Sequence, residues 1–217
     1  MKNTLIVCLF LFPFIAGAQS VYTPYREFIY QVQYRDSSDT NEFYLSMWTT
    51  DSTWEADASQ RQLFYAYHNW HNGKSQQVLN KDSLAAAWPY RQNIESTGFI
   101  ENENQIWLHP PRWSTLSILE YFPFPELKRL AKCGSKYRRA FFGHADSLNK
   151  TILLLYRMKV TCGEYVIVQG VAKHKGEEWR TVTQWDDNLG LIRLRCEILP
   201  YTNTSINLQL VDIVEHR

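Results

Sequence analysis

The ten residues 190–199, GLIRLRCEIL, alternate between apolar and charged side chains, and this alternation restricts the fold more than any other feature of the chain. The apolar set is Ile192, Leu194, Cys196 and Ile198, and the charged set is Arg193, Arg195 and Glu197. Successive side chains of a β-strand point to opposite faces, so the two sets would lie on two sides of one strand. One face must then be buried and the other wet, as antiparallel sheets allow.

Five strand-like runs of this kind follow one another in the C-terminal third. They cover residues 151–161, 164–173, 178–186, 190–199 and 205–215. Cys162-Gly163, Lys175-Gly176 and the segment 187–190 separate four of the runs, and glycine provides the positive φ angle that tight turns need. The pattern predicts an antiparallel meander.

The N-terminal half adds strands and the middle adds short helices. Residues 27–35 and 42–49 are predicted strands, and Asn72-Gly73 is typical of a hairpin turn. Predicted helices cover residues 83–88, residues 114–121 after a Ser114 cap, and a segment that begins at Pro125 and ends before Gly134. The expected fold class is α+β, predominantly antiparallel β, with eight to ten strands. We expect a curved meander sheet or incomplete barrel with two or three short helices as a cap.

Residues 1–18 have the pattern of a secretory signal peptide. Lys2 gives a positive start, residues 5–15 are mainly apolar, and Ala16-Gly17-Ala18 supplies small residues for cleavage. A membrane anchor is the alternative, but the apolar run is shorter than the roughly 18 residues that span a bilayer. We expect residues 19–217 to form one domain with no transmembrane segment, exported to the periplasm or cell surface of a Gram-negative bacterium.

Three cysteines remain after such cleavage, so at most one internal disulfide can form. Cys196 belongs to the apolar set above and is expected in the core. Cys133 and Cys162 each precede a glycine at a predicted chain reversal, and they are the candidate pair. The alternative, in which all three thiols stay reduced and structural, is favoured by the sequence alone.

The formal net charge of +1 gives no global electrostatic reason to bind nucleic acid. Cations nevertheless gather in residues 128–139, where no acid occurs. They are Lys128, Arg129, Lys132, Lys136, Arg138 and Arg139. One interpretation is a patch that docks to an anionic surface, such as phosphate-bearing lipid headgroups or acidic polysaccharide. The alternative is a solvated helix face.

Residues 106–113, IWLHPPRW, combine a rigid step with aromatic and cationic side chains. Pro110 and Pro111 fix φ and remove two backbone donors, so the step cannot lie in the middle of a sheet. The candidate ligand-binding residues at the rim of the sheet are Trp107, His109, Arg112 and Trp113. Alternatively, the two tryptophans clamp the step onto the core.

Signals for catalysis, metal and cofactor binding are weak. The chain has no Gly-x-Ser-x-Gly motif and no glycine-rich phosphate loop. His68 and His71 lie three apart on a predicted strand, so their side chains would point to opposite faces rather than share a metal. We therefore expect no catalytic residue, metal or cofactor.

Three segments carry a family resemblance. The His109–Arg112 step HPPR, LEYFPFPELK at 119–128 and WDDNLGLIRLR at 185–195 resemble uncharacterised secreted proteins of Bacteroidetes-type bacteria, a family that brings no known activity. A meander under a helical cap is also similar in outline to the half-barrels of periplasmic lipoprotein carriers. That second likeness is one of fold only.

These features predict an exported, non-catalytic domain that binds an apolar or amphiphilic ligand or a cell-envelope partner, with lipid, glycan and envelope proteins as candidates. One alternative is a small envelope hydrolase acting on glycan or lipid, with His109 as general base. The other is a structural or assembly subunit.

Overall fold

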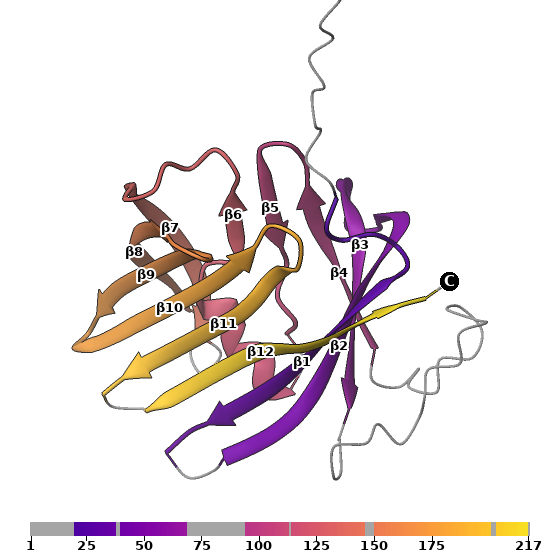
Figure 1. Ribbon diagram of the computed structural model, residues 1–217. Helices are drawn as coiled ribbons and strands as arrows, with labels where there is room; N and C mark the ends of the chain where they lie inside the picture. The colour runs from indigo at the N-terminus through magenta and orange to yellow at the C-terminus, as the bar shows by residue number, and fades with distance from the viewer. Residues whose placement is uncertain are drawn as a thin grey trace, which may run out of the picture.

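The protein forms a twelve-stranded antiparallel sheet with one short helical segment (Figure 1). The computed structural model describes residues 20–37, 40–68, 94–112, 114–145, 150–200 and 203–216. The strands are β1 (Arg26–Arg35), β2 (Thr40–Trp54), β3 (Asp57–His68), β4 (Ile94–Glu101), β5 (Gln105–Leu108), β6 (Glu126–Lys128), β7 (Lys136–Ala145), β8 (Lys150–Cys162), β9 (Val166–His174), β10 (Glu177–Asp186), β11 (Gly190–Leu199) and β12 (Thr204–Glu215). The helical segment is η1 (Ser114–Tyr121), a 3-10 helix. The predicted signal peptide lies outside the described residues.

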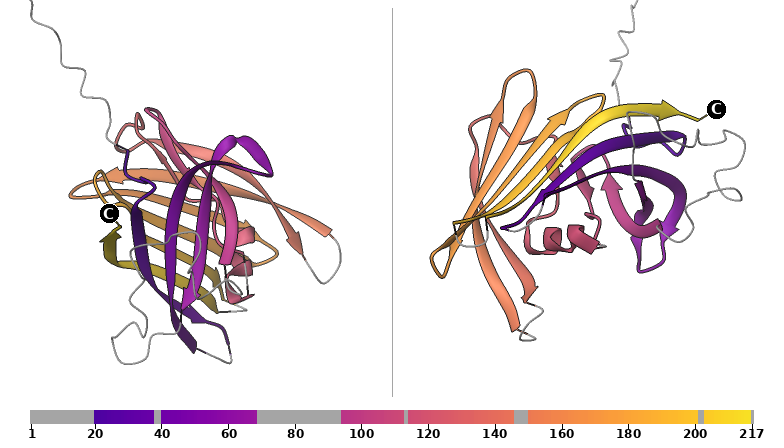
Figure 2. Two further views of the ribbon diagram at one scale, coloured as in Figure 1. Left: turned by 90° about the vertical axis from the view of Figure 1, so that its right-hand side faces the viewer. Right: turned by 90° about the horizontal axis from the view of Figure 1, so that it is seen from below.

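The strands follow the order β6-β5-β4-β3-β2-β1-β12-β11-β10-β9-β8-β7, and the sheet does not close into a barrel. Its two edge strands, β6 and β7, are consecutive in the chain and are joined by residues 129–135. The sheet is strongly curved, so its inner face surrounds the segment that contains η1 (Figure 2). The prediction of a mainly antiparallel, curved and open sheet is confirmed, whereas the predicted number of eight to ten strands is too low.

The main core lies on the inner face, and β8 and β11 supply it largely by alternation, whereas β1 and β2 bury runs of consecutive residues. In β11 the four predicted apolar side chains are buried, while Arg193, Arg195 and Glu197 reach solvent to varying degrees. In β8, Leu154, Tyr156, Met158 and Val160 are buried in the same way. This is the one-sided burial that the alternating sequence predicts.

η1 fills the hollow of the sheet. Leu116 and Leu119 of η1 are buried, as is Phe122, whose ring lies 5.6 Å from that of Trp179. The hydroxyl of Tyr156 donates a hydrogen bond of 3.2 Å to the carbonyl oxygen of Tyr121. Apolar side chains from the chain itself therefore occupy this part of the inner space.

The predicted cap of two or three helices is wrong for the described residues. Residues 114–121 form only a 3-10 helix, which Pro123 and Pro125 follow closely. The segment after Pro125 forms β6 instead of a helix, because Leu127 pairs with Ile106 of β5 and is buried. Tertiary pairing outweighs the helix propensity of so short a segment. The predicted helix at 83–88 and the Asn72-Gly73 turn lie outside the described residues.

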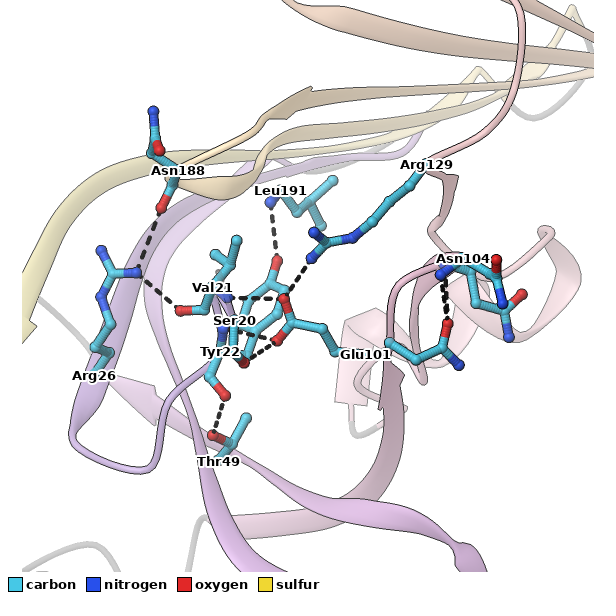
Figure 3. A network of polar contacts seen from close by, with 12 residues as sticks. Ser20, Val21, Tyr22, Arg26, Thr49, Glu101, Asn104, Arg129, Asn188 and Leu191 are labelled. Atoms are coloured by element: carbon cyan, nitrogen blue, oxygen red, sulfur yellow. Dashed lines mark hydrogen bonds and ion pairs between the residues drawn. The ribbon is translucent and has the colours of Figure 1, made fainter. Parts of the chain in front are cut away.

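The segment before β1, residues 20–25, crosses the inner face and is bound by one buried carboxylate (Figure 3). Glu101, the last residue of β4, accepts hydrogen bonds from the hydroxyl of Ser20 at 2.7 Å and from the backbone N–H groups of Val21 at 2.8 Å and Tyr22 at 3.0 Å. It also pairs with Arg129 at 2.8 Å. The segment is thereby fixed to the β4 side of the sheet.

Tyr22 of the same segment contacts the opposite half of the sheet. Its buried hydroxyl accepts a hydrogen bond of 2.9 Å from the backbone N–H of Leu191 in β11, and burial raises the pKa of the hydroxyl above its ordinary value. Gly190 has a φ of +73°, and a Cβ there would lie 2.5 Å from the Tyr22 hydroxyl. Glycine is therefore needed at this turn both for its conformation and for its small size.

The described residues contain no helix with the length and apolar character of a membrane span.

Candidate functional site

The step after β5 is held by hydrogen bonds of its own backbone. The N–H of His109 donates to the carbonyl of Gly98 at 3.1 Å, and the His109 carbonyl accepts from the hydroxyl of Tyr65 at 2.8 Å. Leu108 donates its N–H to the carbonyl of Pro125 at 3.0 Å. Pro110 and Pro111, which have no N–H, directly follow these bonds. The connection is therefore rigid and attached at both sides.

The His109 ring lies inside a cage of aromatic side chains, with 7% of the residue exposed. Its centroid is 5.2 Å from that of Trp54, 5.3 Å from that of Trp107 and 4.4 Å from that of Phe124. Trp54 can approach because Gly98 has no side chain: a Cβ there would lie 2.5 Å from Cε3 of Trp54. His109 was expected at an exposed rim, and the structure instead buries it.

Arg112 reaches back over the same ring. Its Nη2 lies 2.7 Å from Nδ1 and 2.9 Å from Nε2 of His109, and a neutral imidazole has one nitrogen that can accept its proton. Burial, and secondly the charge of Arg112, lower the pKa of His109 to about 4. His109 is therefore neutral at pH 7. Arg112 is itself positioned by Glu95, whose carboxylate accepts from the Arg112 N–H at 2.9 and 3.0 Å, and by Glu120 at 3.4 Å.

This cluster has the geometry of a structural clamp. The half-buried Trp107 packs against His109 and Phe124 rather than lining an open cleft. The His109 ring nitrogens face a guanidinium, and the described contacts bring no carboxylate or nucleophile to them. The arrangement therefore gives no support to His109 as a general base. Trp113, the fourth candidate, lies outside the described residues.

Half of the predicted basic patch is neutralised within the structure. Arg129 pairs with Glu101, and Arg139 pairs with Glu126 at 2.8 Å. Lys128 lies 3.8 Å from Glu126 and places its ammonium 5.2 Å from the centre of the Tyr137 ring. Arg139 and Lys128 connect the two edge strands β6 and β7, where the backbone ladder is open, and Arg129 connects the end of β6 to β4. The ion pairs of Arg129 and Arg139 hold the sheet together, whereas the Lys128 side chain stays half exposed.

The space behind these bridges is almost full. A cavity of about 10 Å³, about enough for one water molecule, lies there. It is lined by Pro123, Phe124, Glu126, Tyr137, Arg139, Met158, Val168, Thr181 and Thr183. A larger, open hollow of about 490 Å³ lies at the β9–β10 turn. Its wall includes Lys173, Lys175 and Arg180, of which Lys173 and Arg180 pair with Glu178.

The other predicted cations, Lys132, Lys136 and Arg138, are exposed and have no acidic partner among the described residues. Lys136 and Arg138 belong to a larger surface, which we call the outer β7–β8 face. It consists of Lys136, Arg138, Ala140 and Phe142 of β7, and Leu153, Leu155, Arg157 and Lys159 of β8. All eight are exposed.

The cross-strand pairs divide this face into a cationic part and an apolar part. Lys136 is paired with Lys159 and Arg138 with Arg157, so two pairs of like charges face each other. Like charges directly opposite each other destabilise a sheet. The remaining two pairs are apolar: Ala140 with Leu155 and Phe142 with Leu153. Phe142, Leu153 and Leu155 are 65%, 49% and 57% exposed, respectively.

Sequence reasoning missed Arg157, Lys159 and the three large apolar residues of this face. A signal for the apolar part was present: residues 152–155, ILLL, do not alternate. A strand with apolar residues on both faces needs a second apolar contact beyond the core. The cations of β7 could not be grouped with Arg157 and Lys159 of β8, because β7 was not recognised as a strand.

The candidate cysteine pair is joined. A disulfide links Cys133, in the turn before β7, to Cys162 at the end of β8, and so fixes one end of the β7–β8 hairpin. Cys196 is a free, buried thiol whose sulfur lies 3.6 Å from Oγ1 of Thr181. Burial raises the pKa of this thiol to about 12, so it stays protonated at neutral pH. It is a core residue.

Neither a protein-family model, nor a curated protein, nor a solved structure matches the chain.

Proposed function

We propose that this protein is an exported, non-catalytic domain that binds a partner in the cell envelope through its outer β7–β8 face. One observation carries the proposal: four exposed cations, paired with like charges across the ladder, adjoin exposed apolar pairs on the same face. Such an arrangement costs stability in the isolated protein. An anionic, amphiphilic partner would remove both costs.

The inner face gives less support to a carrier function. Leu116, Leu119 and Phe122 fill the hollow where a half-barrel carrier would hold its ligand, and the cavity beside them has room for about one water molecule. Binding at the surface agrees better with this packing than binding inside. The His109 cluster then has a structural role, because it fixes the chain between β5 and η1.

Export rests on the signal-peptide pattern of residues 1–18, and the disulfide supports it. Structural disulfides persist mainly in oxidising compartments such as the periplasm. Cys133 and Cys162 lie at the base of the β7–β8 hairpin, so the crosslink stabilises the element that we propose as the binding surface.

Co-sedimentation with a Gram-negative envelope fraction tests the proposal. The mature chain should pellet with the envelope, and the double variant Arg138→Gln/Arg157→Gln should stay in the supernatant. The matched control is Arg180→Gln/Arg195→Gln, which removes the same two charges from cations that already pair with Glu178 and Glu197. The control should pellet like the wild type. If both double variants pellet equally, or if the wild type does not pellet, the proposal is wrong.

A further inference from the structure

We infer that the partner of the outer β7–β8 face is the surface of an anionic lipid bilayer, with the apolar pairs inserted among the lipids and the cations at the headgroups. This inference rests on the proposed function and names the partner of the same surface. It is carried by the order of the pairs along the hairpin, by the shape of the hairpin and by its charge.

The apolar pairs occupy a part of the hairpin that has separated from the sheet. The ladder between β8 and β9 ends where Arg157 pairs with Val171, whereas β7 and β8 stay paired as far as Ala145 and Lys150. Ala140, Phe142, Leu153 and Leu155 therefore lie on a two-stranded arm, which projects beyond the neighbouring strands (Figure 2). The outer face of such an arm can lie on a soft surface without the neighbouring strands.

The arm keeps its inner side anchored in the core. Leu154 and Tyr156, which alternate with the exposed leucines, are fully buried. Exposure of Leu153 and Leu155 is thus a property of one face and not of a loosely attached strand. The core covers the apolar side chains of the inner face, whereas Phe142, Leu153 and Leu155 on the outer face are about half exposed or more.

The spacing of the four pairs fits a lipid interface that meets the outer face, and not the end of the hairpin beyond Phe142, where His144, Thr151 and Lys150 are polar. Successive pairs on one face of a sheet are about 7 Å apart, so Phe142 and Arg138 are separated by about 13 Å along the strand. Peripheral proteins bury apolar side chains about 5–10 Å into the boundary between headgroups and acyl chains. The nearest cations, Arg138 and Arg157, lie two pairs behind the Phe142–Leu153 pair. They would be at the phosphate level when the outer face lies obliquely on the bilayer, and guanidinium groups bind phosphate oxygens well.

Charge complementarity selects this occupant over two others. A second copy that paired along the free edge of β7 would gather both sets of cations on one continuous face, which opposes dimerisation. A soluble polyanion would satisfy the cations but leave Phe142, Leu153 and Leu155 in water. An anionic bilayer, unlike these two occupants, offers contacts to both the charged and the apolar pairs.

Vesicle flotation tests the inference. The mature chain is mixed with vesicles of phosphatidylcholine alone or with about 30% phosphatidylglycerol, at about 0.15 M and 0.5 M NaCl, where charge screening differs. We expect binding to the anionic vesicles only, and weaker binding at high salt. Arg138→Gln/Arg157→Gln should weaken binding about 30-fold, since each cation near an anionic surface contributes about 1 kcal/mol. The control Arg180→Gln/Arg195→Gln should bind like the wild type.

A second pair of variants isolates the apolar part. Phe142→Ser/Leu153→Ser should weaken vesicle binding by at least about tenfold. Val211→Ser, which changes an exposed apolar residue on β12, should not. Circular dichroism and thermal melting check that all variants are folded. If Phe142→Ser/Leu153→Ser binds as the wild type does, no apolar insertion occurs and the inference is wrong.

Further outcomes separate this inference from the proposed function. If the protein pellets with the envelope fraction through Arg138 and Arg157 but ignores anionic vesicles, the lipid partner is wrong and the proposed function stands. Binding to lipid-free peptidoglycan sacculi in place of vesicles would assign a glycan partner. If the chain binds neither envelope nor vesicles, both proposals fail.

Discussion

The carboxylate of Glu101 lies 2.8 Å from Nη2 of Arg129, and only 3% of the Glu101 side chain is exposed. Glu101 ends β4 and Arg129 follows β6, so the pair joins two strands on one side of the sheet. Because Glu101 also accepts the backbone N–H groups of Val21 and Tyr22, the pair fixes the N-terminal segment as well (Figure 3). One buried charge therefore holds three parts of the chain.

Glu101→Gln should lower the free energy of unfolding by about 3 kcal/mol, because it leaves the guanidinium of Arg129 without its buried counter-charge. Urea denaturation measures the change. Glu103→Gln, at an exposed position two residues later, is the matched control and should change stability by less than about 0.5 kcal/mol. Equal stability of the two variants would show that the network of Glu101 is not stabilising.

His109 should make the protein less stable in acid. Its pKa is lowered to about 4 in the folded state, against about 6.5 in the unfolded chain. Between these values the unfolded state binds more protons, so stability is present above pH 6.5 and is lost as pH falls toward 4. The loss should approach about 3 kcal/mol.

The measurement is the free energy of unfolding from pH 7 to pH 4 for the wild type and for His109→Phe, whose ring suits the aromatic cage. The variant should lack this part of the pH dependence. Parallel curves for the two proteins would mean that His109 titrates normally in the folded state and that the cage does not exclude water from it.

Loss of the disulfide should destabilise the protein as a whole. Cys133 and Cys162 are 29 residues apart in sequence, and a crosslink over such a loop contributes about 3–4 kcal/mol by restricting the unfolded chain. Cys133→Ser/Cys162→Ser should lose this amount in urea denaturation. Unfolded mature wild-type protein should react with one equivalent of a thiol reagent, at Cys196, when no reductant is present. Three equivalents would show that the bond does not form.

The C-terminal meander could be predicted from the sequence because its signal is local. Side chains two residues apart in β11 share a face, so the alternation at Ile192, Leu194 and Cys196 is enough to identify the strand and its buried side. The same local reasoning identified the reversals at Cys133 and Cys162, and from them the candidate cysteine pair. The sequence alone nevertheless favoured three reduced thiols, and the disulfide shows that this preference was wrong.

The candidate surface could not be predicted, because its members are defined by distant partners. Arg129 and Arg138 look equivalent in the sequence, but Arg129 is neutralised by Glu101, 28 residues away, while Arg138 is paired with another cation across a hairpin. β6 has three residues, too few for any periodicity, and it forms only because β5 lies beside it. Helix propensity was therefore the stronger local signal there and gave the wrong element.

Gly98→Ala tests whether the aromatic cage around His109 depends on close packing. A Cβ at residue 98 would lie 2.5 Å from Cε3 of Trp54 and 2.2 Å from Oε1 of Gln60. The amide end of Gln60 can turn away, but the Trp54 ring must move as a unit. We expect a loss of about 1–3 kcal/mol in the free energy of unfolding. Gly163→Ala is the matched control, since a Cβ there meets nothing within 4 Å, and it should change stability by less than about 0.5 kcal/mol.

Displacement of Trp54 in Gly98→Ala also admits water to the His109 ring. NMR titration of this variant should therefore give a His109 pKa above the value of about 4. A variant that is as stable as Gly163→Ala and keeps the low pKa would show that Trp54 does not close the cage.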